Sequence, residues 1–374
     1  MIEELFGNIL NLQWQQVVMW AIGGLLIWLA IKKQMEPSLL LPMGFGAILV
    51  NLPMSGAVTQ IIDGVEEVGP IDVLFNAGIA NELFPLLLFV GIGAMIDFTP
   101  LLSNPKMMIF GAAAQFGIFF TLCVATLMGF EVKDAASIGI IGAADGPTSI
   151  VVANMFQSNY LGAIVVVAYS YMALVPIVQP RVIKLITTKH ERCIRMAYAD
   201  RQVSKLTRIL FPIIVTALAG LVAPRSVALI GFLMFGNLIR ECGVLDGLSD
   251  TAQKDLANLI TLFLGLTVAT KMQAASFLTP QTLLIMVLGL VAFVFDTVGG
   301  VMVAKVYNLF AKTKINPMIG AAGISAFPMS ARVINKMGLE EDNQNFLLMH
   351  AVGINVSGQI ASVIAGGMIM TLFA

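Results

Sequence analysis

Long apolar runs separated by short polar segments follow one another along almost the whole chain. Most of them approach the roughly 20 residues that a helix needs to cross the hydrocarbon core of a bilayer. Both halves show the same order: two spans, a connecting piece, two spans, an interrupted segment and a final span. We predict spans at residues 17–31, 37–52, 83–96, 107–130, 161–178, 209–222, 227–239, 256–269, 283–310 and 346–373.

The two interrupted segments resemble each other. The first break reads Ile141-Gly-Ala-Ala-Asp-Gly-Pro-Thr-Ser-Ile150, and the second reads Ile319-Gly-Ala-Ala-Gly-Ile-Ser-Ala-Phe-Pro-Met-Ser-Ala-Arg332. Both begin Ile-Gly-Ala-Ala, and 178 positions separate Ile141 from Ile319. Broken apolar segments at matching positions of two halves are typical of a transporter's binding site.

Composition restricts the class of protein. The 374 residues are 58% hydrophobic and only 11% charged, whereas soluble domains carry about 25% charged residues. The chain is therefore predicted to be an integral membrane protein. Its three cysteines show no disulfide or metal spacing, and its two histidines form no ligand cluster.

Charge predicts the orientation. Residues 181–208 hold eight basic residues against two acidic ones, which favours a cytoplasmic location by the positive-inside rule. A nucleic-acid-binding patch is the weaker alternative in so hydrophobic a chain. If each break is a re-entrant hairpin, this stretch lies inside together with Lys32, Lys33 and Lys106, while the acidic loop 63–67 lies outside. A full crossing at the first break would place the eight basic residues outside.

We therefore predict an all-α polytopic membrane protein with two inverted-topology repeats. Their paired re-entrant or broken helices meet near mid-membrane. The first repeat covers residues 1–180, a basic cytoplasmic connector covers 181–208, and the second, inverted repeat covers 209–374.

The breaks carry candidate oxygen ligands for a small alkali cation, which prefers oxygen to sulfur or imidazole. Candidate ligands are the tip carbonyls and the side chains of Asp145, Thr148, Ser149, Asn316, Ser325, Ser330, Asn355 and Ser357. A charged Asp145 at the bilayer centre would cost about 2.5–3.5 kcal/mol on insertion scales. It is therefore suited to exchanging a proton for a metal cation, although a helix cap is the structural alternative.

Three further residues are candidates with equally plain structural alternatives. Arg332 is either the counter-charge of Asp145 or a positive-inside anchor. Tyr171 is either functional or an ordinary packing residue, and its hydroxyl needs a partner. Asp296 is a second acid within a predicted span and a candidate to line the same cavity.

Three motifs give a resemblance to a known family: Phe75-Asn-Ala-Gly-Ile-Ala-Asn-Glu-Leu-Phe-Pro85, Gly142-Ala-Ala-Asp-Gly-Pro-Thr148 and Asn316-Pro-Met-Ile-Gly-Ala-Ala-Gly-Ile-Ser325. They resemble the β subunit of sodium-pumping, biotin-dependent decarboxylases of oxaloacetate, methylmalonyl-CoA, malonyl-CoA or glutaconyl-CoA. The resemblance extends from about residue 22 to 367.

The resemblance implies a subunit that decarboxylates carboxybiotin, consumes a proton and exports Na+. It implies catalytic roles for Asp145, Tyr171 and Arg332, with Tyr171 and Arg332 also at the carboxybiotin. The Na+ ligands that it implies are Asp145, Thr148, Asn316, Gly320, Ser325 and Asn355. Asn335 and Ser362 also match positions implicated in the family.

The resemblance also implies partners. The chain has no Met-Lys-Met biotin acceptor, and the nearest string is Thr270-Lys-Met272. Carboxybiotin would come in trans from a biotin carrier protein, loaded by a carboxyltransferase α subunit, with a small membrane γ or δ subunit in an oligomeric complex of the cytoplasmic (inner) membrane. Nucleic acid is not an expected partner. The alternative function is a secondary Na+-coupled carboxylate transporter with the same inverted-repeat architecture.

Overall fold

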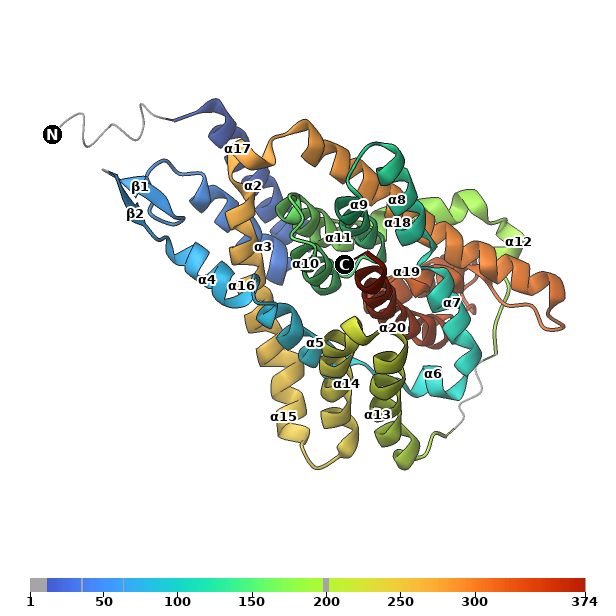
Figure 1. Ribbon diagram of the computed structural model, residues 1–374. Coiled ribbons are helices and arrows are strands. Elements are labelled where there is room, and N and C mark those ends of the chain that lie inside the picture. Colours follow the sequence, from blue (N-terminus) through green and yellow to red (C-terminus); the bar gives the residue numbers. More distant parts are fainter. Residues whose placement is uncertain (1–11, 35, 63, 198–201, 374) are drawn as a thin grey trace.

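The computed structural model describes residues 12–34, 36–62, 64–197 and 202–373. The predicted charges at Asp63, Asp200 and Arg201 lie outside these residues. Six helices in the described ranges are long and apolar enough to cross a membrane, and the number is eight if each of two bent helix pairs forms one span. The chain is a helical, multi-pass membrane protein, as predicted (Figure 1).

The first half contains the elements up to the end of the helix after the first break. They are α2 (Trp14–Lys33), α3 (Pro37–Val50), β1 (Gln60–Ile62), β2 (Val65–Glu67), α4 (Pro70–Gly78), α5 (Leu83–Met95), α6 (Thr99–Ser103), η1 (Pro105–Met107), α7 (Met108–Ala113), α8 (Phe116–Leu127), α9 (Val132–Gly139), η2 (Ile140–Ala143), α10 (Gly146–Met155) and α11 (Leu161–Ile186).

The second half begins after a short helix in the connector. Its elements are α12 (Lys189–Arg192), α13 (Lys205–Val222), η3 (Pro224–Ser226), α14 (Val227–Cys242), α15 (Asp246–Thr251), η4 (Ala252–Leu256), α16 (Ala257–Val268), η5 (Ala269–Met272), α17 (Ala274–Phe277), α18 (Pro280–Phe310), η6 (Pro317–Gly323), α19 (Met329–Glu341) and α20 (Leu348–Phe373).

Helix packing sorts these elements into a centre and two sides. In Figure 1, α2, α3 and α16 lie together on one side, α13, α14 and α15 form the lower edge, and α9, α10, α11 and α20 lie in the middle. The long helix α18 contacts both η2 and η6, and α20 contacts both α10 and η6. These two helices therefore hold the two breaks together.

Small residues allow the closest helix contacts. A Cβ atom built on Gly93 of α5 would lie 1.8 Å from the carbonyl oxygen of Leu233, and one on Gly236 of α14 would lie 2.0 Å from that of Val90. Glycine at both positions lets the two backbones touch, which is a common way for helices to associate in membranes.

The structure departs from the predicted elements in three places. Residues 60–62 and 65–67 pair as antiparallel strands, β1 and β2, where a loop was predicted. Residues 240–255 were predicted to be a polar connection, but 246–256 are helical and continue into α16. The predicted span 107–130 is present as one candidate span, Pro105–Leu127, but a short turn divides it between α7 and α8.

Asp296 explains the division between α7 and α8. Its Oδ1 atom accepts a hydrogen bond from Gly117 N at 2.5 Å, in the first turn of α8. The first N–H groups of a helix lack partners within the helix, and here a carboxyl group on α18 supplies one. The sequence pattern could not reveal the division because the partners are 179 residues apart.

Candidate functional site

The first broken segment, α9–η2–α10, returns to the place where it begins. Just after α10, Ser158 Oγ donates to Asp134 Oδ1 at 2.5 Å, close to the start of α9. The rings of Phe130 and Tyr160, which flank the segment, also meet edge to face at 5.6 Å. The two ends are therefore neighbours, and this segment has the geometry of a hairpin.

Asp145 lies at the tip of this hairpin. Ala144 has a left-handed conformation (φ +51°), and Asp145 then caps α10, with Pro147 in the first turn. Its carboxylate accepts bonds from Thr148 N (3.3 Å) and Thr148 Oγ1 (2.8 Å). Asp is a favoured N-cap and Pro a favoured first-turn residue, so the sequence itself directs the chain to restart a helix here.

Asp145 also makes a contact that is unrelated to capping. Its Oδ2 atom also accepts a hydrogen bond from Ser362 Oγ on α20 at 3.0 Å, and the side chain is buried. The nearest polar groups are therefore hydroxyls, whose oxygens can also bind a cation. Ser362 links this carboxyl group to the second half of the chain.

The second broken segment also has both ends at one place. At its start, Asn316 Nδ2 donates to the carbonyl oxygen of Arg192 at 2.8 Å; after α19, Asn345 Nδ2 donates to the same oxygen at 2.9 Å. Between these points the chain forms η6, runs through residues 324–328 without regular structure, and continues as α19.

The two breaks meet at their tips. Ser325 N donates to the carbonyl oxygen of Ala143 at 3.0 Å, and Ser325 Oγ donates to the carbonyl oxygen of Gly358 on α20 at 3.0 Å. The prediction that the two breaks come together is therefore consistent with the geometry. Asp145 lies two residues beyond Ala143.

Four side-chain amides hold the second tip. Every carbonyl from Ala321 to Ser325 accepts a hydrogen bond from an amide NH2 on another helix or turn. The bonds run from Gln179 Nε2 to Ala321 O (2.7 Å), from Asn355 Nδ2 to Ala322 O (3.0 Å) and Ile324 O (2.6 Å), from Gln115 Nε2 to Gly323 O (3.3 Å) and from Gln359 Nε2 to Ser325 O. Non-helical backbone at membrane depth requires such partners.

These amides surround the expected ion site. The carbonyls of this tip were expected to be exposed to a cation; each of the five accepts a hydrogen bond from an amide with one of its two lone pairs. Free acceptors remain on the amides themselves: Gln115 Oε1, Asn355 Oδ1 and Gln359 Oε1 are buried and accept no bond from a described residue. The glutamines were not among the predicted residues, although a polar residue within an apolar span is a signal of function.

The remaining predicted hydroxyls and Gly320 lie around the same centre. Ser149 Oγ donates to Asp145 O at 2.9 Å, Ser330 Oγ to Ala321 O at 3.2 Å and Ser357 Oγ to Ile354 O at 2.7 Å. Gly320 faces Gly300 of α18: a Cβ atom on either residue would lie 2.1 Å from the other's carbonyl oxygen.

Tyr171 and Tyr169 differ in their relation to Asp145. The Tyr171 hydroxyl donates to the carbonyl oxygen of Met286 on α18. The ring of Tyr169 instead packs on Gly146, where a Cβ atom would lie 2.2 Å from it. The Tyr169 hydroxyl is buried and has no hydrogen-bond partner among the described residues. Residues two apart on a helix face different directions: Tyr169 packs on Gly146, next to Asp145, whereas Tyr171 packs in a cluster with Ile141 and other apolar residues of the same hairpin.

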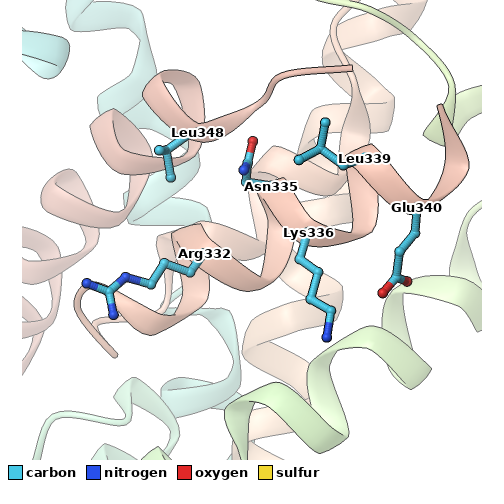
Figure 2. A pocket seen from close by; sticks show the side chains of 6 residues that line it. All are labelled: Arg332, Asn335, Lys336, Leu339, Glu340 and Leu348. Carbon is cyan, nitrogen blue, oxygen red and sulfur yellow. The ribbon is translucent and has the colours of Figure 1, made fainter. Parts of the chain in front are cut away.

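Arg332 lines a surface pocket of about 390 Å³ with Asn335, Lys336, Leu339, Glu340 and Leu348. Figure 2 shows that Arg332, Asn335 and Lys336 project from one helix, α19. Arg332 is exposed. Burial raises the pKa of Glu36, in the turn between α2 and α3, and the charge of Arg332 opposes that rise. Arg332 therefore lies within electrostatic range of this turn.

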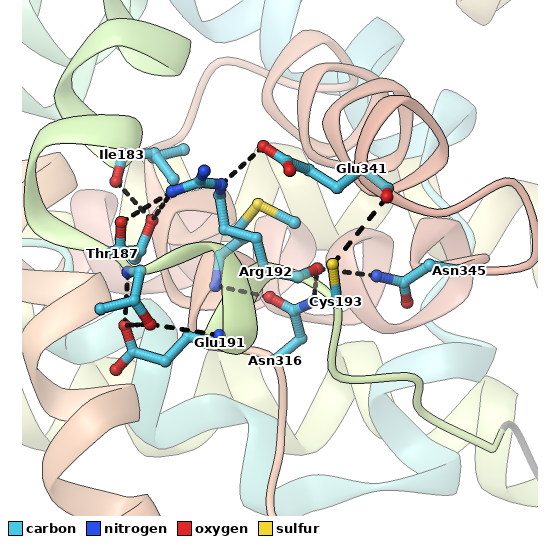
Figure 3. Close-up of polar contacts among 10 residues, drawn as sticks. Ile183, Thr187, Glu191, Arg192, Cys193, Asn316, Glu341 and Asn345 are labelled. Carbon is cyan, nitrogen blue, oxygen red and sulfur yellow. Dashed lines mark hydrogen bonds and ion pairs between the residues drawn. The ribbon is translucent and has the colours of Figure 1, made fainter.

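The connector segment, residues 187–196, is attached to the second broken segment (Figure 3). Arg192 Nε lies 2.7 Å from Glu341 Oε1, and the Arg195 guanidinium makes two bonds to Asp342, at 2.6 and 3.0 Å. Asn316 donates to both Arg192 O and Ile194 O. Asn316, an expected Na+ ligand, thus lies at the base of its hairpin, and part of the connector's positive charge is paired within the chain.

No group of three or more His, Cys, Asp or Glu residues among those described is arranged to hold a metal ion. The candidate site is instead a set of hydroxyl, amide and carboxylate oxygens around the two tips. Such ligands suit a hard cation of low charge.

Comparison with known proteins agrees with the resemblance of the three motifs. The family model of the Na+-transporting oxaloacetate decarboxylase β subunit matches residues 15–373. The chain is 46% identical to the probable oxaloacetate decarboxylase β chain of Vibrio cholerae, over 98% of this chain and 96% of that protein. It is 49% identical to the glutaconyl-CoA decarboxylase subunit β of Acidaminococcus fermentans (96% and 93%) and 46% identical to the methylmalonyl-CoA decarboxylase subunit β of Propionigenium modestum (96% and 94%).

Proposed function

The chain belongs to the family of Na+-transporting decarboxylase β subunits, and we propose that it decarboxylates carboxybiotin presented by a separate biotin carrier protein. It is a membrane subunit in which decarboxylation is coupled to Na+ transport. Export of one Na+ against 100 mV requires about 2.3 kcal/mol, which decarboxylation would supply.

One observation carries the proposed mechanism: the buried Asp145 carboxyl group, held by Thr148 and Ser362, at the point where the two tips are hydrogen-bonded. A carboxyl group in this position is stable when it carries a proton or a bound cation. We propose that Na+ replaces the proton on Asp145. Thr148, Ser325 and Asn355 then supply neutral oxygens, and Gly320 permits the close approach of η6 and α18.

The proton released at Asp145 balances the decarboxylation. In carboxybiotin the bond between the ring nitrogen and the carboxylate carbon breaks, CO2 leaves, and the nitrogen keeps the electron pair and takes up a proton. The positive charges of Arg332 and Lys336 make the α19 pocket a suitable place for the carboxylate. The Tyr171 hydroxyl stays in this proposal as a group that acts on α18 through Met286.

In transporters built from inverted repeats, a site between the two repeats opens to each side of the membrane in turn. We propose that the first hairpin enters from outside and the second from the cytoplasm of the inner membrane. In that orientation Arg332, Lys336 and the connector segment face the cytoplasm, where a biotin carrier protein and a carboxyltransferase α subunit would dock. A small γ or δ membrane subunit would complete the complex.

Proteoliposomes that contain the purified chain test this function. Added carboxybiotin should be decarboxylated in a Na+-dependent manner, with parallel movement of 22Na+ across the membrane. Na+ movement that is driven by a dicarboxylate gradient, without release of CO2, would contradict the proposal and favour a secondary Na+-coupled carboxylate transporter.

A further inference from the structure

The motif Phe75–Pro85 carries part of the family resemblance but lies outside the two breaks. It forms a bend of 62° between α4 and α5. A Cβ atom on Gly78 would lie 2.1 Å from the ring of Phe84, so this ring fills the space at Gly78. Within the bend, Asn81 Nδ2 donates to Ala77 O at 2.8 Å. The motif therefore stabilises a third interruption of an apolar segment.

This bend contacts the first broken segment, since α5 and α10 pack against each other. Asn154 Nδ2, on α10, donates to Ala80 O at 3.0 Å, and the same atom lies 3.4 Å from Glu82 Oε1. Glu82 has a left-handed backbone conformation (φ +65°), which residues other than glycine adopt uncommonly. The bend thus presents two acceptors, a carbonyl and a carboxylate, to one side-chain amide of the hairpin.

Asn154 and Asp145 lie at opposite ends of α10. Asp145 is the N-cap, and Asn154 belongs to the last turn of this helix of 10 residues, which is about 15 Å long. Residues 150–153, between them, are aliphatic, and their side chains are buried. Aliphatic packing is non-directional, so it defines the position of a helix along its axis less sharply than a hydrogen bond does. The depth of Asp145 therefore depends on the polar contacts at the two ends.

Polar side-chain contacts link both ends of α10 to other helices. At the tip, Ser362 Oγ donates to Asp145 Oδ2 at 3.0 Å. At the other end, Asn154 binds the bend, and the side chain of Arg225 lies 3.8 Å from the sulfur of Met155. A thioether sulfur is a weak acceptor. Asn154 therefore makes the stronger polar contact at the end remote from the tip.

We propose that Asn154 is a positioning residue for Asp145: its bonds to Ala80 and Glu82 fix the depth at which α10 presents the carboxyl group to Ser362. This inference rests on the proposed exchange of Na+ and a proton at Asp145. A helix transmits a shift of one end to the other, because its backbone hydrogen bonds keep its length constant. Loss of the Asn154 contact should therefore weaken Na+ binding at Asp145. The pocket on α19, which is proposed to bind carboxybiotin, should keep its affinity.

The experiment compares Asn154→Leu with Ser158→Ala in the full chain. Leucine has a similar size but no donor, so it loses the contact with the bend. Ser158→Ala loses a bond at the same end of α10, but that bond joins the hairpin only to itself, at Asp134. For Asn154→Leu, we expect the Na+ concentration for half-maximal decarboxylation and the Kd for 22Na+ to rise about fivefold. The KM for carboxybiotin should change less than about twofold.

Ser158→Ala should lower thermal stability in detergent and leave the Na+ requirement unchanged. Equal rises of the Na+ requirement in the two variants would overturn the positioning role, because the effect would then come from general loosening of the hairpin. An unchanged Na+ requirement in Asn154→Leu would overturn it as well. The same result would follow if the KM for carboxybiotin rose as much as the Na+ requirement.

If Asn154→Leu fails to assemble, an exchange of amide and carboxylate serves instead. Asn154→Asp places a carboxylate against the carboxylate of Glu82 and the carbonyl of Ala80, and it should also raise the Na+ requirement. Adding Glu82→Gln supplies an amide donor to the new carboxylate and should recover part of the lost Na+ affinity; no recovery would overturn the proposal. The binding of 22Na+ separates this inference from the proposed function. A wild-type chain that binds Na+ but does not decarboxylate carboxybiotin would disprove the function, and the effect of the variants on 22Na+ binding would still decide the role of Asn154.

Discussion

Ser325 N donates to the carbonyl oxygen of Ala143 at 3.0 Å, so the two broken segments are joined directly, backbone to backbone. Ala143 belongs to the first Ile-Gly-Ala-Ala string, and Ser325 lies three positions beyond the end of the second. If one tip moves, this hydrogen bond must therefore break, or the other tip must move with it. Asp145 lies two residues beyond Ala143, and Gln359 donates to the carbonyl oxygen of Ser325, so this bond gives a physical route for coupling between Asp145 and the second tip.

The Ser325 hydroxyl can be tested separately from this backbone bond. Ser325→Ala removes the hydrogen bond to Gly358 O but keeps the N–H bond to Ala143. Loss of one buried hydrogen bond costs about 0.5–1.5 kcal/mol of stability. If the hydroxyl is also a Na+ ligand, the Na+ concentration for half-maximal decarboxylation should rise as well.

Ser330→Ala is the control for this variant. Ser330 is also buried and donates to Ala321 O, so the loss of thermal stability in detergent should be similar. Its Na+ requirement should not change. An equal rise in both variants would assign the effect of Ser325→Ala to the packing of the second tip rather than to ion binding.

Asp145→Asn separates the charge of the tip from its capping role. Asn is as good an N-cap as Asp, so α10 should persist and the variant should assemble. The exchangeable proton is lost, however, and we expect Na+-dependent decarboxylation and 22Na+ uptake to fall by about 100-fold or more, the low end of the usual contribution of a proton-transferring group.

Asp134→Asn is the matched control, because Asp134 is a second buried carboxyl group in the same hairpin. It binds Ser158 at the base of the hairpin, and its replacement should lower thermal stability while the Na+ dependence of decarboxylation remains. Retention of most activity in Asp145→Asn would remove Asp145 from the mechanism.

The breaks were predictable from sequence because their causes are local. Ala144-Asp145-Gly146-Pro147 interrupts one helix and provides the cap and first-turn proline of the next. The basic connector and the resemblance to the family were also visible in the sequence. The prediction that the tips meet followed from the pairing of the breaks, and the Ser325–Ala143 bond agrees with it.

The contacts around the breaks were not predictable in the same way, because they join residues far apart in the chain. Gln115 lies 208 positions from its tip carbonyl, and Gln179 lies 142 from its own. Asn316 appeared equivalent to Ser325 in the sequence, but its side chain binds Arg192 in the connector segment. Tyr169 and Tyr171 occupy the same short motif, and only the packing of α11 distinguishes them.

The basic and acidic residues of the pocket on α19 should have opposite effects on the binding of carboxybiotin. Arg332→Ala and Lys336→Ala should each raise the KM for carboxybiotin by about fivefold, since an exposed ion pair contributes up to about 1 kcal/mol. Glu340 lines the same pocket, so Glu340→Gln should lower the KM by removing a repulsive charge. The Na+ requirement should not change in any of the three.

Lys312→Ala controls for the general loss of positive charge, because Lys312 is exposed and does not line the pocket. Steady-state decarboxylation of free carboxybiotin measures all four variants. If Lys336→Ala and Glu340→Gln change the KM for carboxybiotin in the same direction, the pocket does not bind the carboxylate.

Acidification should release the connector segment. The hydrogen bonds from Arg195, and then the one from Gln344 N, hold the pKa of Asp342 below its ordinary value of 3.8. A carboxyl group with a lowered folded-state pKa contributes stability above its unfolded pKa and loses that contribution as the pH falls through the folded value. Hydrogen exchange of residues 187–196, corrected for its intrinsic pH dependence, should show constant protection between about pH 5 and 8 and weaker protection below about pH 4.

In Asp342→Asn, the hydrogen-exchange protection of residues 187–196 should be weaker than in wild type above about pH 5, and it should no longer decrease on acidification. Asp250→Asn is the control, because Asp250 of α15 pairs with Lys254 of η4, 3.3 Å away and outside the connector. Protection that is the same in wild type and Asp342→Asn across the whole range would show that Arg195 does not hold the connector segment.

The pair Gly300 and Gly320 distinguishes close packing from ion binding. A Cβ atom on either glycine would lie 2.1 Å from the carbonyl oxygen of the other, so Gly300→Ala and Gly320→Ala should both force α18 away from η6. We expect each to lower the stability by about 1–3 kcal/mol, the usual effect of overpacking. Both variants should reduce Na+-coupled decarboxylation to a similar extent.

Gly24→Ala in α2, where a Cβ atom meets nothing within 4 Å, should leave both properties unchanged. Thermal unfolding in detergent and Na+ titration of the decarboxylation rate measure the two effects. If Gly300→Ala is tolerated while Gly320→Ala abolishes Na+ dependence, the second break contacts the ion at Gly320 itself, and the amide oxygens alone do not account for the site.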